Sequence, residues 1–188
     1  MASVVPRSMK REISKRGGAM SKRMVKIMFV LALVHGVAVP GAEAQVNAMS
    51  GKATLKYTKQ LTVPAGDVDG HIMQVAEASG TSASTGKWDF MSGAAATSVG
   101  TADLTNGNGA QSGYFILSKD GNKTVCKYTG TIRTVLSSEG KPLTSMSGEW
   151  KYVAGAGVFA GCTGQGVYQG SFISQDEYIV EFKGIVVQ

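Results

Sequence analysis

The C-terminal part of this sequence alternates between two classes of side chain, and this alternation limits the available folds more than any other feature. Aromatic residues and glycines recur at every second position within short segments, as in Trp150 and Tyr152, or Tyr178 and Phe182. Charged and polar residues occupy the positions between them. A period of two indicates β-strands with one face packed inside and the other in water. Glycines on the inner face suit a small, strongly coiled barrel, where a missing side chain relieves crowding.

Similar short segments, separated by clusters of Gly, Asn, Asp and Ser, extend back through the sequence without any helical periodicity. The pattern predicts an all-β fold, a single small eight-stranded antiparallel up-and-down barrel of lipocalin-like appearance. Closure into a barrel removes the exposed sheet edges. An outer-membrane barrel would need an apolar outward face, whereas the outward set here is Lys, Glu, Gln and Thr. The expected strands are Lys52–Gln60, His71–Ser79, Trp88–Thr97, Ser112–Ser118, Lys123–Leu136, Ser145–Val153, Gly166–Ile173 and Glu177–Val187.

Residues 1–44 form a leader that is first basic and then apolar, and these regions follow one another as in a secretory signal peptide. Cationic residues precede the apolar run 27–39, and small residues at Ala42 and Ala44 predict cleavage before Gln45. The apolar run is shorter than the roughly 20 residues of a membrane span. We therefore expect a signal peptide over 1–44 and one domain over 45–188, exported to the periplasm or medium without a stable membrane anchor.

The charge of the chain resides in the leader. The formal net charge is +6, and residues 1–44 hold eight basic and two acidic residues. Basic and acidic residues are balanced in 45–188, so the charge of this part gives no reason to expect nucleic acid as a partner. The two cysteines, Cys126 and Cys162, predict a disulfide bridge in an exported domain, although two buried thiols are the alternative.

The most distinctive motif runs from Gly148 to Gly170. A Trp150-containing strand is followed by Gly155-x-Gly157-x-Phe159-x-Gly161-x-x-Gly164-x-Gly166. This resembles the strand–turn–strand unit of the allene oxide cyclase and dirigent barrels and their bacterial relatives of unknown function. The resemblance implies a small eight-stranded antiparallel barrel, but no catalytic residues match. A dinucleotide fingerprint is disfavoured because the glycines after Ala160 cannot form the helix that it requires.

Few groups in residues 45–188 can support acid–base chemistry. His71 and Glu77 share one face of a predicted strand, and an inward Glu77 would have its pKa raised by burial. In the other register, Ile72, Gln74, Ala76 and Ala78 point inward instead, and a single strand does not decide between the two. The remaining candidates for the lining of a pocket are aromatic or acidic: Asp89, Tyr114, Tyr128, Trp150, Tyr152 and Tyr178.

No cofactor or metal site is expected. His71 is the only imidazole after the leader, which excludes a multi-histidine zinc site. Asp67-Val-Asp69-Gly70 begins like a calcium loop, but Ala78 stands where the bidentate Glu should be. Three functions remain: a barrel that binds a small apolar ligand, a cofactor-independent cyclase or isomerase, and a solid structural or interaction barrel. Ligand binding ranks first.

Overall fold

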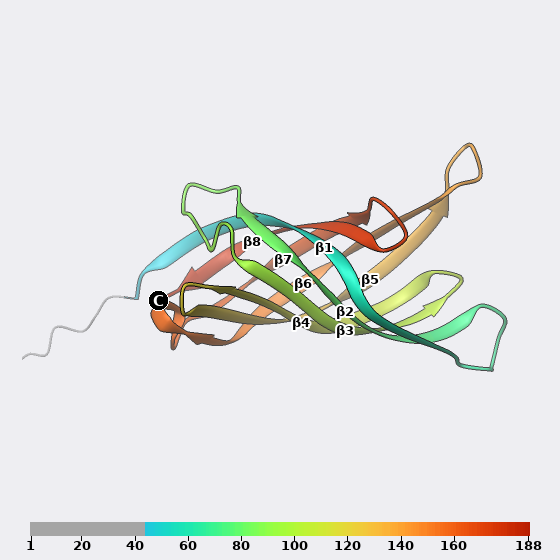
Figure 1. Cartoon of the computed structure of the whole chain (residues 1–188), viewed down its shortest axis with the longest axis horizontal. Helices are drawn as coiled ribbons and strands as arrows, with labels where there is room; N and C mark the ends of the chain where they lie inside the picture. Colours follow the sequence, from blue (N-terminus) through green and yellow to red (C-terminus); the bar gives the residue numbers. More distant parts are fainter. Residues whose placement is uncertain (1–43) are drawn as a thin grey trace, which may run out of the picture. The chain divides into compact units, whose positions relative to one another are not determined.

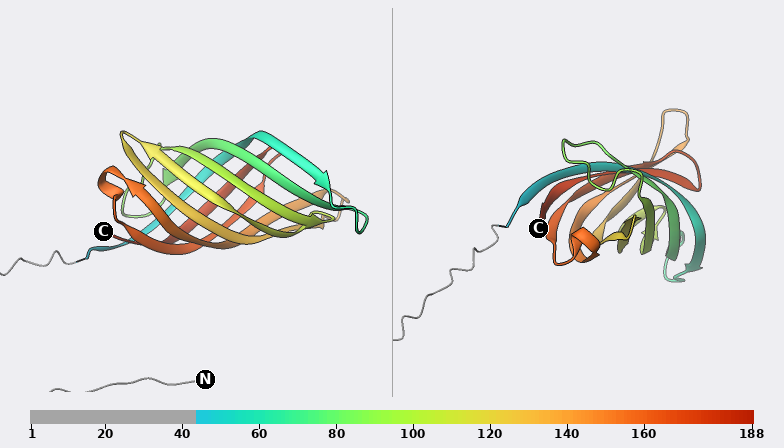
Figure 2. Two further views of the ribbon diagram at one scale, coloured as in Figure 1. Left: turned by 90° about the horizontal axis from the view of Figure 1, so that it is seen from below. Right: turned by 60° about the vertical axis from the view of Figure 1, so that its left-hand side comes forward.

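The structure, a computed structural model, describes residues 44–188, and within them the chain forms a closed antiparallel barrel of eight strands in sequential order. The predicted all-β barrel is therefore confirmed, while the predicted leader lies outside the described residues up to position 43. The strands run obliquely around the barrel (Figures 1 and 2). Their bounds are β1 Val46–Pro64, β2 His71–Ser84, β3 Ala95–Thr105, β4 Asn108–Lys119, β5 Asn122–Leu136, β6 Pro142–Ala156, β7 Thr163–Phe172 and β8 Glu177–Val187.

Tight turns set the register of the consecutive hairpins. Asn106 and Gly107 join β3 to β4, and Asp120 and Gly121 join β4 to β5; all four residues have positive φ. Two-residue turns of this kind match the right-handed twist of the strands, and Asn, Asp and Gly tolerate the conformation best. Barrel closure pairs β1 with β8, and Gln45 exchanges two backbone hydrogen bonds with Gln188 just beyond that ladder.

One predicted strand was placed wrongly. The sequence analysis expected a strand over 88–97, whereas residues 85–94 form a loop and β3 starts at Ala95. Trp88 and Phe90 suggested a strand, but in the structure they fold over the barrel end instead. Phe90 lies with its ring centroid 5.5 Å from that of Phe159, which belongs to the 3₁₀ turn η1 (Gly157–Phe159). Contacts between the loop and this turn thus override the local strand preference.

Glycines make room for aromatic rings inside the barrel. A Cβ atom added at Gly166 on β7 or at Gly184 on β8 would lie 2.5 Å from Cζ2 of Trp150. The Trp150 ring from β6 therefore lies directly against two glycines, one on β7 and one on β8. Other aromatic side chains also lie over glycines: the hydroxyl of Tyr128 over Gly113, the ring of Tyr168 over Gly148, and the ring of Phe182 over Gly51.

The two ends of the barrel differ. At the end where β1 begins and β8 ends, the inward residues Met49, Leu117 and Val186 are buried, and Phe90 and Phe159 cover them. We call this the closed end. At the other end, the inward residues Gln74, Gln111 and Phe172 are only half-buried. We call it the open end, because these inward side chains are partly exposed to solvent there.

The outer surface is less polar than the sequence suggested. Leu61 and Val63 on β1 pair with Val75 and Met73 on β2, and all four side chains are exposed. The expectation of a polar outward face came from the strands of the second half, and it does not hold for the β1–β2 hairpin. No helix within residues 44–188 is long and apolar enough to cross a membrane.

Candidate functional site

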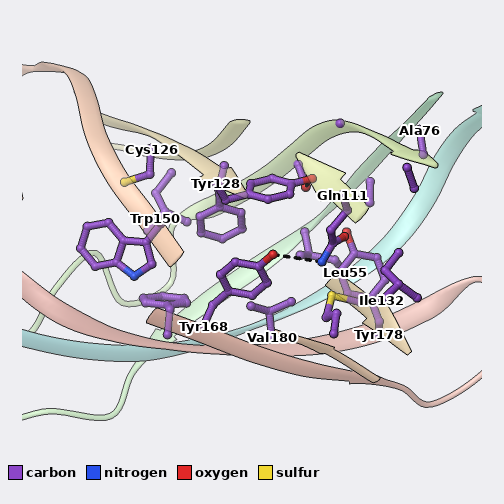
Figure 3. A pocket seen from close by; sticks show the side chains of 18 of the residues that line it. Leu55, Ala76, Gln111, Cys126, Tyr128, Ile132, Trp150, Tyr168, Tyr178 and Val180 are labelled. Atoms are coloured by element: carbon purple, nitrogen blue, oxygen red, sulfur yellow. Dashed lines mark hydrogen bonds between the residues drawn. The ribbon is translucent and has the colours of Figure 1, made fainter. Parts of the chain in front are cut away.

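The barrel encloses a cavity of about 90 Å³ that runs from the closed end towards the open end. All eight strands contribute to its lining, and Phe90 from the β2–β3 loop adds to it. Figure 3 shows Trp150 and Cys126 on one side and Gln111, Ile132 and Tyr178 on the other. The lining residues are apolar side chains, hydroxyls and amides, so every polar group in the wall is neutral at pH 7.

The closed half of the cavity holds an unused hydrogen-bond donor. Trp150 is 6% exposed, and its Nε1 atom is buried without a hydrogen-bond partner. Leaving a buried N–H unpaired costs about 1–3 kcal/mol. The neighbouring rings of Phe115 and Phe182, with centroids 5.7 Å apart, offer only apolar surface. The closed half is thus an apolar space, and Trp150, which lines it, has a free N–H donor buried beside it.

The open half carries a group of tyrosine hydroxyls. Tyr168 accepts a hydrogen bond from Gln111 Nε2 at 3.0 Å, and the hydroxyl of Tyr128 lies 3.3 Å from that of Ser98. The rings of Tyr57 and Tyr178 pack nearby at a tilt of 50°, with centroids 5.4 Å apart. This half is therefore more polar than the closed half, although no charge enters it.

Burial keeps these tyrosines protonated. It raises the pKa of Tyr57 and of Tyr168 to about 12, and it raises the pKa of Tyr128 and of Tyr178 as well. A group with a pKa far above neutrality is a weak acid or base at pH 7. The hydroxyls can donate hydrogen bonds to a guest, or polarise a carbonyl, but they are poorly suited to accepting a proton from it.

The structure brings together three of the aromatic residues proposed for a pocket. Tyr128, Trp150 and Tyr178 all line the cavity. Tyr152 also points inward but is not part of the lining; its buried hydroxyl has no hydrogen-bond partner, and burial raises its pKa. Tyr114 points outward from β4 and is 46% exposed, and Asp89 is exposed in the β2–β3 loop. Tyr114 and Asp89 therefore do not belong to the cavity.

Glu77 lies on the outer surface, so the register of β2 is the second of the two considered. Gln74, Ala76 and Ala78 line the cavity instead. The Glu77 carboxylate accepts hydrogen bonds from Lys59 Nζ and Thr58 Oγ1, both at 3.1 Å. These bonds lower its pKa, which corrects the expectation that burial would raise it. Glu77 is thus not an interior acid.

His71 also lies outside the cavity, at the start of β2. Its ring nitrogens contact two carboxylates, with Nδ1 2.5 Å from Asp67 and Nε2 2.7 Å from Asp103. The Asp103 hydrogen bond and then the Asp67 bond raise the pKa of His71. Asp67 belongs to the β1–β2 turn and Asp103 to β3. We call these three residues the His71 clamp; it ties the β1–β2 turn to β3.

The disulfide expected between Cys126 and Cys162 is not formed in this structure, where both thiols are free. Cys126 on β5 pairs with Tyr152 of β6, and Cys162 precedes β7 on the other side of β6. The Cys162 thiol donates instead to the carbonyl oxygen of Val158, 3.9 Å away, within the turn that precedes β7.

Several lining residues were missed by the sequence analysis. Tyr57 and Tyr168 were assigned to strands without being proposed for the site, and Ser98 and Gln111 were not singled out for it. The alternation that places Leu55 inside also places Tyr57 inside, and Tyr168 shares the inner face with Phe172. The polar residues gave no such signal, because an inward Gln or Ser looks like an ordinary outward residue. Within residues 44–188, no group of three or more His, Cys, Asp or Glu side chains is placed to hold a metal ion.

No family model and no curated protein matches this chain. Among solved structures, the chain is similar to a dirigent protein described as a pterocarpan synthase, with a TM-score of 0.42 and 13% identity, over 84% of this chain and 99% of that one. A likeness of this size transfers neither an activity nor a substrate. The resemblances to dirigent proteins and to allene oxide cyclases stay predictions.

Proposed function

We propose that this protein binds a small, largely apolar molecule inside its barrel. The observation that carries the proposal is the cavity itself, which is walled by aromatic and aliphatic side chains with a few neutral polar groups. This is the usual composition of sites for small molecules, where apolar surface supplies affinity and isolated polar groups fix orientation. The half-buried residues at the open end provide a way in, and the closed end provides a floor.

A cofactor-independent cyclase or isomerase is the second candidate. The tyrosine hydroxyls favour it, because donors aimed at a carbonyl or epoxide oxygen can stabilise charge that develops there. Proton abstraction would need a base with a pKa nearer to neutrality, and the proposed candidates His71 and Glu77 both lie outside the cavity. Binding therefore ranks above catalysis.

Native mass spectrometry of protein purified gently from its own host tests the binding function. We expect a retained small molecule that leaves on denaturation. Ala76→Phe, which adds a ring to the cavity wall near the open end, should abolish or reduce retention. Glu77→Gln, one residue away on the outer surface, should leave it unchanged. An empty wild-type barrel that also fails to take up any apolar compound would favour the solid structural role instead.

We also propose that the barrel acts outside the cytoplasm, in the periplasm or the medium, after removal of residues 1–44. The proposal rests on the leader sequence. The proposed mature chain keeps Gln45, which exchanges two backbone hydrogen bonds with Gln188. N-terminal sequencing of exported protein should give Gln45 as the first residue. A full-length chain retained in the membrane fraction would contradict this.

A further inference from the structure

We propose that the molecule bound in the cavity is uncharged and presents a hydrogen-bond acceptor, such as a carbonyl or ether oxygen, to the indole N–H of Trp150. The inference rests on the proposed binding function and adds the chemistry of the ligand. It begins from one atom: Nε1 of Trp150 is buried and has no partner among the described residues. Buried N–H groups in proteins are nearly always paired. A guest that supplies an acceptor therefore removes the free-energy cost of leaving this N–H without a hydrogen bond.

The position of Trp150 is fixed by the fold. Its ring lies against Gly166 and Gly184, where any side chain on those residues would collide with it. The ring is also packed among buried residues of the closed half, so it cannot readily turn its nitrogen towards solvent. A donor held in this way is already ordered, so the guest has only to displace the apolar side chains that cover Nε1.

The charge of the wall argues that the guest is neutral. Among the described residues that line the cavity, none is an acid, a lysine, an arginine or a histidine. Burying a charged group without an opposite charge is strongly unfavourable. A carboxylate or an amine would lose its hydration in the cavity without a counter-charge to replace it. A ketone, aldehyde, ester, lactone or ether carries an acceptor without this penalty.

The two halves of the cavity indicate how the guest lies. The apolar closed half, with Phe115 and Phe182, receives the hydrocarbon part, and the acceptor meets Trp150 there. A longer guest would extend towards Gln111 and the tyrosine hydroxyls of the open half. The guest is therefore expected to be an apolar skeleton with a deep acceptor and, where it is long enough, a second polar group nearer the open end.

Titration with three probes of similar size tests this: ethylbenzene, which has no acceptor; acetophenone, which has a neutral one; and benzoate, which is an anion. The protein is labelled with ¹⁵N, and its two tryptophans, Trp88 and Trp150, give two indole N–H signals. We expect acetophenone to move the Trp150 signal downfield and to leave Trp88 in place. Benzoate should bind at least about tenfold more weakly than acetophenone, since a charge is buried unpaired.

Affinities in Trp150→Phe measure the hydrogen bond itself. The variant removes the N–H and keeps an aromatic ring, so the preference for acetophenone over ethylbenzene should fall by about three- to tenfold relative to wild type. Comparing the ratio of the two affinities between variant and wild type cancels the difference in hydration between the two probes. Trp88→Phe, in the loop that covers the closed end, is the matched control and should leave the ratio unchanged. If Trp150→Phe does not fold, the shift of the Trp150 indole signal in the wild-type protein still shows whether the guest's acceptor binds this N–H.

The outcomes separate the two proposals. Equal preference in wild type and Trp150→Phe, together with an unmoved Trp150 signal, would overturn the acceptor while leaving ligand binding in place. Benzoate binding as tightly as acetophenone would overturn the neutral guest. Probes that move no signal of any lining residue, such as the Ile132 methyl groups, would overturn ligand binding itself.

Discussion

Individual glycines determine which aromatic rings the barrel can hold. Gly184→Ala would bring a methyl group against Trp150 and against the backbone oxygen of Gln165. We expect a loss of about 1–3 kcal/mol in the free energy of unfolding, the usual effect of overpacking a core. Urea denaturation measures this loss, and a shifted Trp150 indole signal should accompany it.

Lys183→Ala is the matched control for Gly184→Ala, because Lys183 is the exposed neighbour on the same strand. A surface substitution of this kind should stay within about 0.5 kcal/mol of wild type. Equal stability of the two variants would mean that the Trp150 ring does not depend on the glycine beside it.

The two thiols should behave differently. Burial raises the pKa of Cys126 to about 12, so almost none of it is thiolate at pH 8. We expect Ellman titration of the denatured, unreduced protein to find two free thiols. In the native protein Cys126 should react slowly, and Cys162→Ser should leave only this slow thiol. Finding no free thiol after denaturation would mean that the strands rearrange enough to form the bridge.

For individual residues, the sequence predicted which kinds of side chain lie inside the barrel better than it predicted their roles. The alternation around Trp150 and Tyr178 was enough to place both rings inside. It could not reveal that the Trp150 nitrogen would lack a partner, because this depends on which side chains of other strands lie opposite. Glu77 shows the same limit: its direction depended on a register that one strand's sequence does not contain.

Among the elements, the β1–β2 hairpin has its turn tied to β3 by the His71 clamp. Both ring nitrogens of His71 contact carboxylates, and only the protonated imidazole can donate to both. The clamp raises the pKa of His71 above its unfolded value of about 6.5. Its stabilisation should therefore be complete below that value and be lost as the pH rises through the folded-state pKa. The same bonds lower the pKa of Asp67, so acid should weaken the clamp again at low pH.

Thermal unfolding between pH 5 and 9 checks this prediction. The wild-type midpoint should fall as the pH rises across the His71 titration, and His71→Gln should remove most of that fall. Asp103→Asn, which keeps the shape and removes one charge, should leave a smaller fall. Wild type and His71→Gln with parallel profiles would show that the clamp contributes nothing to stability.

Element boundaries were predictable where turns and alternation agreed. β8 was predicted with the bounds that it has, Glu177–Val187, because clear alternation follows a polar turn. β3 was misplaced by several residues, because its segment has few large side chains and the aromatic residues before it serve the closed end. A residue such as Phe90 that covers a barrel end carries the same local signal as one inside a strand.

For the whole molecule, closure of the sheet was the most predictable property, since eight alternating segments leave no better way to remove their edges. The cavity was less predictable. Whether a barrel of this size is solid or hollow depends on the total volume of its inward side chains. Here aromatic rings from other strands partly fill the space beside the inward glycines. The sequence shows that glycines and aromatic rings lie on the inner face, but it does not show which ring lies over which glycine.

The buried tyrosines should make the whole barrel sensitive to alkali. Tyr57 and Tyr168 have a pKa of about 12 in the folded protein and about 10 when unfolded. Between these values the unfolded chain loses protons that the barrel retains, so the free energy of unfolding should fall as the pH rises from 10 towards 12. Tyr128 and Tyr178, whose pKa values burial also raises, add to the slope.

Urea denaturation at pH 8, 9, 10 and 11 measures this slope, and tyrosinate absorbance reports when each state ionises. Tyr57→Phe should make the fall between pH 10 and 11 shallower, because one of the contributing protons is gone. At pH 8 both states keep the proton, so the stability difference between variant and wild type there reflects packing alone and is the baseline. If stability stayed flat up to pH 11 while the native protein showed full tyrosinate absorbance, the tyrosines would be exposed to solvent. The polar open half of the cavity would then be an open surface, with no enclosed site for a ligand.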